Sequence, residues 1–147
     1  MVPSGLKPGL RHTQSIRVGE TMTAPALANL FPGFAALPPV LATEFLVALV
    51  ESTCMEALES RLAPGQSSLG VHVDISHNAV TPMGMTVTAE VELIAINRQT
   101  LRFRVLCRDD REVICDGVHD RAIIDDANFR SLADRKRANE DVRLPTV

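Results

Sequence analysis

The sequence predicts an α+β domain in which an antiparallel sheet wraps around one long central helix. The first observation is the run 40–62, which has the length of a helix, contains no glycine or proline, and is apolar nearly all round in its first half. The second is a series of later segments in which apolar and polar residues alternate, as they do in half-buried strands. Consecutive strands after a single helix favour a four-stranded antiparallel meander packed on that helix.

Size and composition fit one globular domain. The chain has 147 residues, of which 46% are hydrophobic and 22% are charged, with a net charge of −3. We place the domain at 11–138, between a flexible N-terminal arm (1–10) and a frayed C-terminal tail (139–147). The negative charge and the absence of Trp and Tyr argue against a nucleic-acid partner.

Neither a membrane segment nor a disulfide framework is expected. No apolar run approaches the ~18 residues that a membrane span needs, and the first residues lack the apolar core of a signal peptide. Cys54, Cys107 and Cys115 form no CxxC pair, and the histidines are not clustered, so structural zinc is not expected either. These features predict a reduced, cytoplasmic protein.

The elements before the central helix are less regular. Residues 11–23 form a mostly polar strand, which suits a sheet edge. Four prolines punctuate 24–39, and the small apolar stretch 26–34 suggests a short helix or a lid. The helix itself ends at Ala63-Pro64-Gly65, which carries the residues expected after a helix C-terminus.

Four strand-like segments follow the helix. In 68–77 the apolar face comprises Leu69, Val71, Val73 and Ile75. Residues 85–97 and 101–107 alternate in the same way, whereas the facing of 111–125 stays open because Gly117 is a candidate bulge. Residues 126–138 have helical character and a basic end. A sheet edge left open in this arrangement would be covered by dimerisation.

Glu51 is the first candidate for chemistry. It directly follows the six-residue apolar run 45–50, and a buried carboxylate is costly unless it is paired or hydrogen-bonded. The alternative is that the helix face has become exposed to solvent at this point.

His77 and Thr43 are the other two candidates. By strand parity His77 points toward the helix, where an imidazole suits proton transfer near neutral pH, although a satisfied core histidine is the alternative. Thr43 lies near the helix start, where it is either an N-cap or part of a site that polarises a carbonyl. Thr43 and Glu51 are separated by about 12 Å of helix rise and about 80° of rotation, so they cannot bond directly. A substrate, a water or a partner subunit would have to lie between them.

Four segments resemble the fluoroacetyl-CoA thioesterase family of the hotdog-fold superfamily, in its order and spacing. They are Leu41–Cys54, Pro64–Gly70, Ser76–Gly84 and Gly117–Ile124. The resemblance implies a hotdog fold, a homodimer with active sites at the subunit interface, and hydrolysis of an acyl-CoA to a carboxylate and free CoA. It implies no metal or organic cofactor.

The resemblance also assigns residues. The family's catalytic positions fall on Thr43, Glu51 and His77, and its substrate-binding positions fall on Gly70, Arg121, Phe34 and Leu37. Glu51 would act as nucleophile or general base, and Arg121 is the best candidate to meet the CoA nucleotide at the cleft mouth. Fluoroacetyl-selective members carry a pair of Phe residues in the lid, but here the second is Leu37. This difference weakens the expectation of fluoroacetyl specificity, leaves a fluoroacetyl-CoA-like substrate open, and would admit other short or medium acyl groups.

Two rival functions remain at this point. The fold also suits a non-catalytic acyl-CoA-binding or regulatory module, which would bind acyl-CoA without turnover. A hydratase on the same fold ranks last, because the Asp/His pattern associated with such enzymes is not evident.

Overall fold

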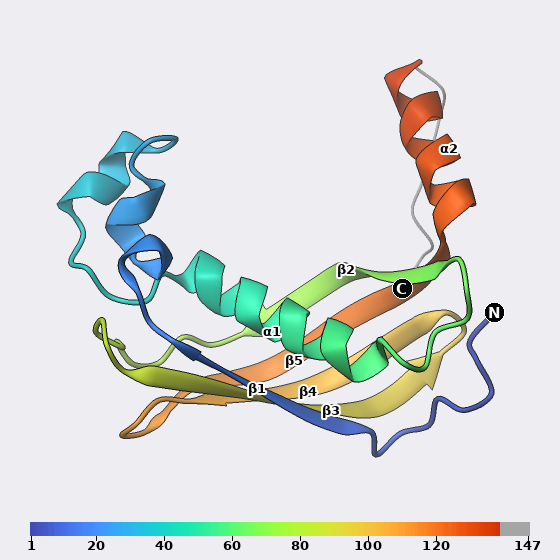
Figure 1. Cartoon of the computed structure of the whole chain (residues 1–147), viewed down its shortest axis with the longest axis horizontal. Coiled ribbons are helices and arrows are strands. Elements are labelled where there is room, and N and C mark those ends of the chain that lie inside the picture. Colours follow the sequence, from blue (N-terminus) through green and yellow to red (C-terminus); the bar gives the residue numbers. More distant parts are fainter. Residues whose placement is uncertain (139–147) are drawn as a thin grey trace.

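The computed structural model describes residues 1–138. Within them, five strands form one antiparallel sheet, and the helix α1 (Thr43–Leu58) lies across its concave face (Figure 1). The strands are β1 (Arg11–Arg17), β2 (Gln66–Ile75), β3 (Thr86–Asn97), β4 (Thr100–Arg108) and β5 (Val113–Asp125), and α2 (Asp126–Arg137) follows β5. The predicted architecture, a sheet wrapped around one long helix, is confirmed.

The strand order is β1-β3-β4-β5-β2. The polar strand β1 lies at an edge, as predicted, and β3, β4 and β5 are consecutive antiparallel neighbours. The prediction of a four-stranded meander is wrong at β2, because β2 pairs with β5 and not with β3. If β5 were the edge strand, its buried backbone would lack hydrogen-bond partners on one side. Pairing with β2 supplies these partners.

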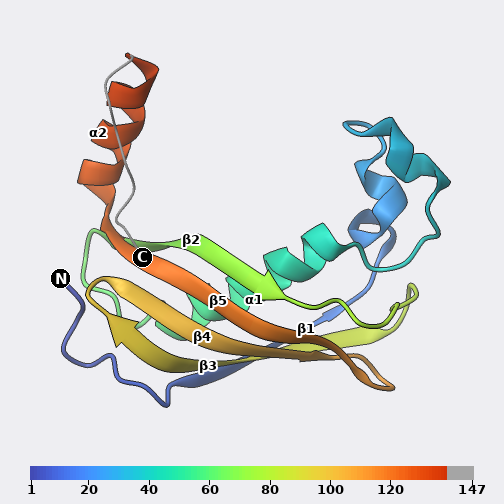
Figure 2. The same cartoon turned by 180° about the vertical axis from the view of Figure 1, so that it is seen from behind.

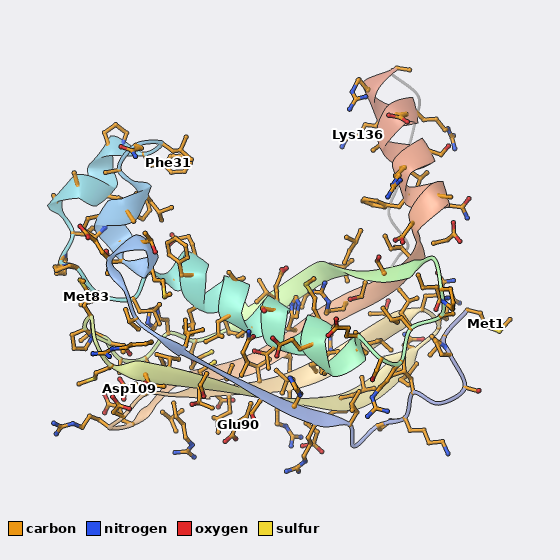
Figure 3. All side chains as sticks on the ribbon, in the orientation of Figure 1. Met1, Phe31, Met83, Glu90, Asp109 and Lys136 are labelled. Atoms are coloured by element: carbon orange, nitrogen blue, oxygen red, sulfur yellow. The ribbon has the colours of Figure 1, made fainter. Side chains whose placement is uncertain are left out.

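The core lies between α1 and the helix-facing side of the sheet. Leu46, Val50 and Leu58 of α1 are fully buried, as are Leu93 and Phe103 of the sheet. The alternation predicted for 85–97 and 101–107 places the correct residues in this core. Glu90, on the opposite parity of β3, points away from α1 (Figure 3).

The helix is shorter than the predicted range 40–62. Val40 and Leu41 form isolated bridges to other parts of the chain, so their backbone is extended and α1 begins at Thr43. At the other end the chain leaves the helix after Leu58 and turns before β2. The composition of 40–62 is helical throughout, but bridges to other segments keep its first residues extended, and a turn ends the helix before its last residues.

The outward face of α1 is not covered by this chain. Ala48 and Met55 are exposed, and Phe45 and Val47 are half-buried. The expectation that protein surrounds the first half of the helix is therefore not met within one copy of the chain.

A bulge in β2 changes which of its residues face the helix. The register with β5 shifts between Gly70 and His72, so one residue is skipped by the ladder. Ser68, expected to point outward, is 9% exposed and lies opposite the buried Ile123, whereas Val73, beyond the bulge, lies opposite His119 and keeps the predicted facing. The predicted apolar face of 68–77 is therefore wrong before the bulge, because a one-residue shift inverts the facing of every side chain on one side of it.

Three apolar residues of the N-terminal ten, Val2, Leu6 and Leu10, pack against the core. Leu6 is 5% exposed and belongs to the core, and the amide of Gly9 donates a hydrogen bond to Leu93 O. The expectation of a flexible arm at 1–10 is corrected here, because its apolar residues are used in packing. The tail expected at 139–147 lies outside the described residues.

Two segments rise from the sheet on the same side as α1. One is the region of three 3₁₀ helices, η1 (Glu20–Met22), η2 (Ala24–Leu27) and η3 (Pro32–Ala36), at the N-terminal end of α1; the other is α2, at the opposite end (Figures 1 and 2). Phe31 lies at the tip of the first and Lys136 near the tip of the second (Figure 3). The predicted lid region is thus built from short 3₁₀ helices beside the start of α1.

Candidate active site

Thr43 and His77 form one half of the candidate site. Thr43 is the first residue of α1, and His77 follows the end of β2. Thr43 Oγ1 and His77 Nδ1 are 2.8 Å apart, within hydrogen-bond distance. The Thr43 side chain does not cap the helix, because the N-cap position is Ala42 and no side-chain cap bond forms there. The hydroxyl instead forms a hydrogen bond with the imidazole of His77.

The surroundings of His77 favour its neutral form. Burial lowers the pKa of His77 below its usual 6.5, and the nearby Glu44 carboxylate opposes that effect. Its second nitrogen, Nε2, is buried and has no hydrogen-bond partner among the described residues. A neutral imidazole with one nitrogen held by Thr43 has the other available for proton transfer.

A small cavity adjoins this pair. Its volume is about 230 Å³, and Phe34 of η3, Leu37, Thr43 and His77 are among the residues that line it. Most of the remaining lining is aliphatic, from Ala24, Pro38, Val40, Leu41 and Ala42. The structure therefore brings both expected lid residues to the same cavity as the Thr43–His77 pair.

Glu51 and Arg121 form the other half of the candidate site. Glu51 lies two turns along α1 from Thr43, and Arg121 projects from the helix-facing side of β5. Arg121 Nη1 and Glu51 Oε2 are 3.6 Å apart; the Glu51 side chain is 40% exposed and that of Arg121 is 2% exposed. The carboxylate is thus paired with a buried cation on one side and open on the other. Glu51 thus has the partner expected for a buried carboxylate and also the partial exposure that the alternative expected.

Gly70 lies against the Glu51 carboxylate. It pairs with Arg121 across β2 and β5. A Cβ atom at this position would lie 2.6 Å from Glu51 Oε1 and 3.1 Å from His119 Cε1. The first separation is shorter than any real contact of such an atom, so only glycine leaves Glu51 in this position.

Arg121 is not at a cleft mouth. Its Nε donates to Ser68 Oγ at 2.8 Å, and its Nη2 donates to Ser68 O at 2.7 Å. The guanidinium is buried beneath Glu51 and its donors are used within the protein. The expectation that Arg121 meets the CoA nucleotide at the surface is therefore corrected, since a phosphate cannot reach it without disrupting these bonds.

The structure does not bring all the candidates together. Thr43, His77, Phe34 and Leu37 gather at the N-terminal end of α1. Glu51, Gly70 and Arg121 gather two turns further along, and no hydrogen bond or ion pair in the described part of the chain links the two groups. Thr43 and Glu51 are eight residues apart on α1, which corresponds to about 12 Å of helix rise.

Two residues that sequence reasoning did not single out belong to the second group. Ser68 was assigned to the outward face of β2, because the bulge that turns it inward leaves no mark in the alternation. His119 stands two residues before Arg121, and in a strand this spacing places both side chains on one face. This shared facing with Arg121 was the sequence signal that could have singled out His119.

A larger groove runs beside the second group. It has a volume of about 750 Å³ and lies between the second half of α1 and the start of β2, with Ser52, Met55 and Ser68 among its lining residues. Ser68 also binds Arg121, so the groove reaches the edge of the Glu51–Arg121 group.

Two features are absent from residues 1–138. No group of three or more His, Cys, Asp or Glu side chains there is arranged to hold a metal ion. No helix in this part of the chain is long and apolar enough to cross a membrane.

Comparison with known proteins supports the resemblance noted in the sequence. Residues 18–127 match the family model described as fluoroacetyl-CoA-specific thioesterase. The chain belongs to this family. The fluoroacetyl-CoA thioesterase of Streptantibioticus cattleyicolor is 36% identical over 132 residues, which cover 90% of this chain and 95% of that protein.

Solved structures of a fluoroacetyl-CoA thioesterase agree in fold. One superposes with a TM-score of 0.87 at 36% identity and covers 90% of this chain and 98% of that one. A phenylalanine-to-alanine variant in complex with fluoroacetate and CoA gives a TM-score of 0.82 at 37% identity, with 84% and 99% coverage. The curled five-stranded sheet around α1 is thus the hotdog fold that the family resemblance implies.

Proposed function

We propose that this protein is an acyl-CoA thioesterase that hydrolyses a short or medium acyl-CoA to a carboxylate and free CoA. The observation that carries the proposal is the 2.8 Å contact between Thr43 and His77, beside a small apolar cavity, on the helix that also carries Glu51. Membership of the thioesterase family supports it. Thr43, Glu51 and His77 are the proposed catalytic residues, with Phe34, Leu37 and Gly70 around the acyl group.

In this proposal the site is completed across the subunit interface, where the Thr43–His77 pair of one copy faces Glu51 of the other, because the two groups of one chain lie about 12 Å apart along α1. His77 and Thr43 act on the thioester carbonyl and on water. If His77 Nδ1–H donates to Thr43 Oγ1, the hydroxyl proton is free to bond the carbonyl oxygen, and Nε2 keeps a lone pair that accepts a proton from water. The lowered pKa of His77 keeps the imidazole in this neutral form at pH 7. The N-terminal end of α1 adds a positive dipole where negative charge develops on the oxygen.

Glu51 acts at the carbonyl carbon in one of two ways. As nucleophile it forms a bond to the carbonyl carbon, CoA leaves as thiolate, and water then cleaves the resulting anhydride. As general base it takes a proton from water, the water oxygen attacks the same carbon, and CoA leaves as thiolate when the C–S bond breaks. Quenching turnover into hydroxylamine and analysing the Glu51 peptide by mass spectrometry separates these roles, because only an anhydride leaves a hydroxamate on Glu51.

We also propose a homodimer with active sites at the subunit interface. β2 is an edge strand, Val73 on it is 43% exposed, and the outward face of α1 carries the exposed Met55. A second copy placed along β2 would cover these surfaces and enclose the open side of Glu51. Sedimentation analysis of the wild type and of Val73→Arg tests the dimer, since the arginine would separate the copies.

The lid favours acyl groups longer than fluoroacetyl. Leu37 stands where fluoroacetyl-selective members of the family carry Phe, and a leucine leaves more room at the cavity than an aromatic ring does.

We place the reaction in the cytoplasm, a setting with which the three free thiols of Cys54, Cys107 and Cys115 are consistent.

The decisive experiment follows release of free CoA by chromatography. The substrates are acetyl-, fluoroacetyl-, butyryl-, hexanoyl- and phenylacetyl-CoA, and the enzymes are the wild type, Glu51→Gln and His77→Ala. Turnover by the wild type that collapses in both variants supports the proposal. Wild-type activity that survives in both contradicts the assigned residues, and binding of acyl-CoA by calorimetry without turnover identifies a non-catalytic module instead.

A further inference from the structure

His119 lies beneath the candidate site on the helix-facing side of β5. It is 1% exposed and pairs with Phe103 of β4 and Val73 of β2. Arg121, two residues further along the same strand, is 2% exposed. Two large polar side chains thus occupy adjacent positions of a face that otherwise packs against α1, where burial is costly unless each polar atom is satisfied.

The hydrogen bonds around His119 fix its protonation. Arg121 Nη1 and His119 Nε2 are 3.2 Å apart, and a guanidinium can only donate. His119 Nε2 is therefore the acceptor, and the ring proton lies on Nδ1. That nitrogen is 2.8 Å from His72 O, to which it donates. His119 is consequently neutral and has one tautomer, and burial also lowers its pKa below the usual 6.5.

The acceptor on His119 completes the anchoring of Arg121. The guanidinium donates to Ser68 Oγ and Ser68 O from Nε and Nη2, which hold one edge of its plane. His119 Nε2 accepts a hydrogen bond from Nη1, the nitrogen that lies 3.6 Å from Glu51 Oε2. Without His119, the Nη1 end of the guanidinium would lose its hydrogen-bond acceptor, and only the longer ion pair would hold it.

We propose that His119 is a positioning residue of the thioesterase reaction, which holds Arg121 in the orientation that fixes the Glu51 carboxylate. His119 does not touch the substrate and acts through Arg121 alone. This inference rests on the proposed function, because the reaction that Glu51 serves is the one proposed above.

Two amide variants separate this role from a merely structural one. In His119→Gln the side-chain amide oxygen can occupy the place of Nε2 and accept from Arg121, while the donor to His72 O is lost. In His119→Asn the amide can reach the place of Nδ1 and donate to His72 O, while Arg121 loses its acceptor. The first variant keeps the contact with Arg121, and the second keeps the tether between β5 and β2.

The proposal expects opposite kinetic results from the two variants. His119→Asn should lower kcat about 10- to 100-fold with little change in KM, as expected when a charge-assisted hydrogen bond is lost. His119→Gln should stay within about threefold of the wild type, which is far less than the loss of such a bond. The reverse order, with Asn active and Gln impaired, would overturn the proposal in favour of a strand tether.

NMR spectroscopy tests the positioning of Glu51 without relying on turnover. Nitrogen NMR of the wild type should show His119 as the neutral Nδ1–H tautomer at pH 7, and the ¹³C carboxyl signal of Glu51 should move in His119→Asn but not in His119→Gln. An Nε2–H tautomer, or an unmoved Glu51 signal in both variants, would refute the positioning role. Absence of wild-type turnover together with the expected spectra would refute the thioesterase and the positioning of its reaction, but not the Arg121 geometry.

Discussion

Replacing Gly70 with alanine should remove most of the turnover while leaving the fold intact. The added Cβ would lie 2.6 Å from Glu51 Oε1, whereas ordinary contacts of such an atom begin at 3.4 Å. The carboxylate must therefore retreat by about 0.8 Å. A displacement of this size at a reacting group can cost about 100-fold in rate, so we expect kcat to fall by that order.

The stability of Gly70→Ala should change little. The atom that must move is the end of a flexible side chain that is 40% exposed, and the ring carbon of His119 at 3.1 Å needs to yield by only a few tenths of an ångström. We expect the free energy of unfolding to stay within about 1 kcal/mol of the wild type. Urea unfolding measures this term separately from activity.

Gly19→Ala is the matched control. A Cβ at Gly19 would meet nothing within 4 Å, so the same change of residue type has no steric consequence there. Release of CoA by Gly19→Ala should equal that of the wild type. If Gly70→Ala also retains wild-type kcat within about threefold, well short of the ~100-fold expected from displacement, the steric argument about Glu51 is refuted.

Three further predictions concern the hydroxyl, the lid and pH. Thr43→Val removes the group that bonds His77 Nδ1 and should lower kcat/KM about tenfold or more, while Thr43→Ser keeps the bond and most of the activity; equal activity in both would contradict the role of the pair. Leu37→Phe fills part of the 230 Å³ cavity and should lower hexanoyl-CoA turnover relative to acetyl-CoA; an unchanged ratio would separate Leu37 from specificity. The folded pKa of His119 is depressed, so below the unfolded value of 6.5 the unfolded chain binds a proton that the native protein does not. The free energy of unfolding should therefore fall with decreasing pH below 6.5, by up to about 1.4 kcal/mol per pH unit from this residue. Urea unfolding of the wild type and His119→Gln at a series of pH values measures this contribution. The same dependence of the free energy of unfolding on pH in both proteins would contradict the prediction.

The sequence predicted those parts of the fold that depend on local periodicity. The strands β3 and β4 alternate strictly because one face packs on α1 and the other meets solvent. The bulge in β2 and the pairing of β2 with β5 depend on contacts between segments about 50 residues apart in sequence, such as Gly70 and Arg121. A pattern of side chains cannot reveal such a pairing, so the facing of Ser68 was assigned wrongly.

The sequence allowed us to predict which residues belong to the candidate site, but not which of them contact one another. The positions of Thr43, Glu51 and His77 followed from a helix start, an apolar run and a strand end, and the family resemblance sharpened them. The bond between Thr43 and His77 spans 34 residues, and no sequence spacing predicts it. The family resemblance led to the expectation of Arg121 at the cleft mouth, whereas here Ser68 and His119 bind its guanidinium inside the protein.

The burial of Arg121 and His119 is difficult to explain by stability alone. A buried ion pair often contributes no more to stability than apolar side chains of the same volume, because desolvation offsets the attraction between the charges. On the same face of β5 the apolar Ile123 is 1% exposed, so apolar side chains are accommodated beside these two positions. What an apolar pair cannot do is hold a half-exposed carboxylate at one place on the helix. The polar pair is therefore best explained as the support of Glu51. Replacing both residues with leucine removes the donors to Ser68 Oγ, Ser68 O and His72 O, so it should lower the free energy of unfolding measured in urea as well as abolish turnover.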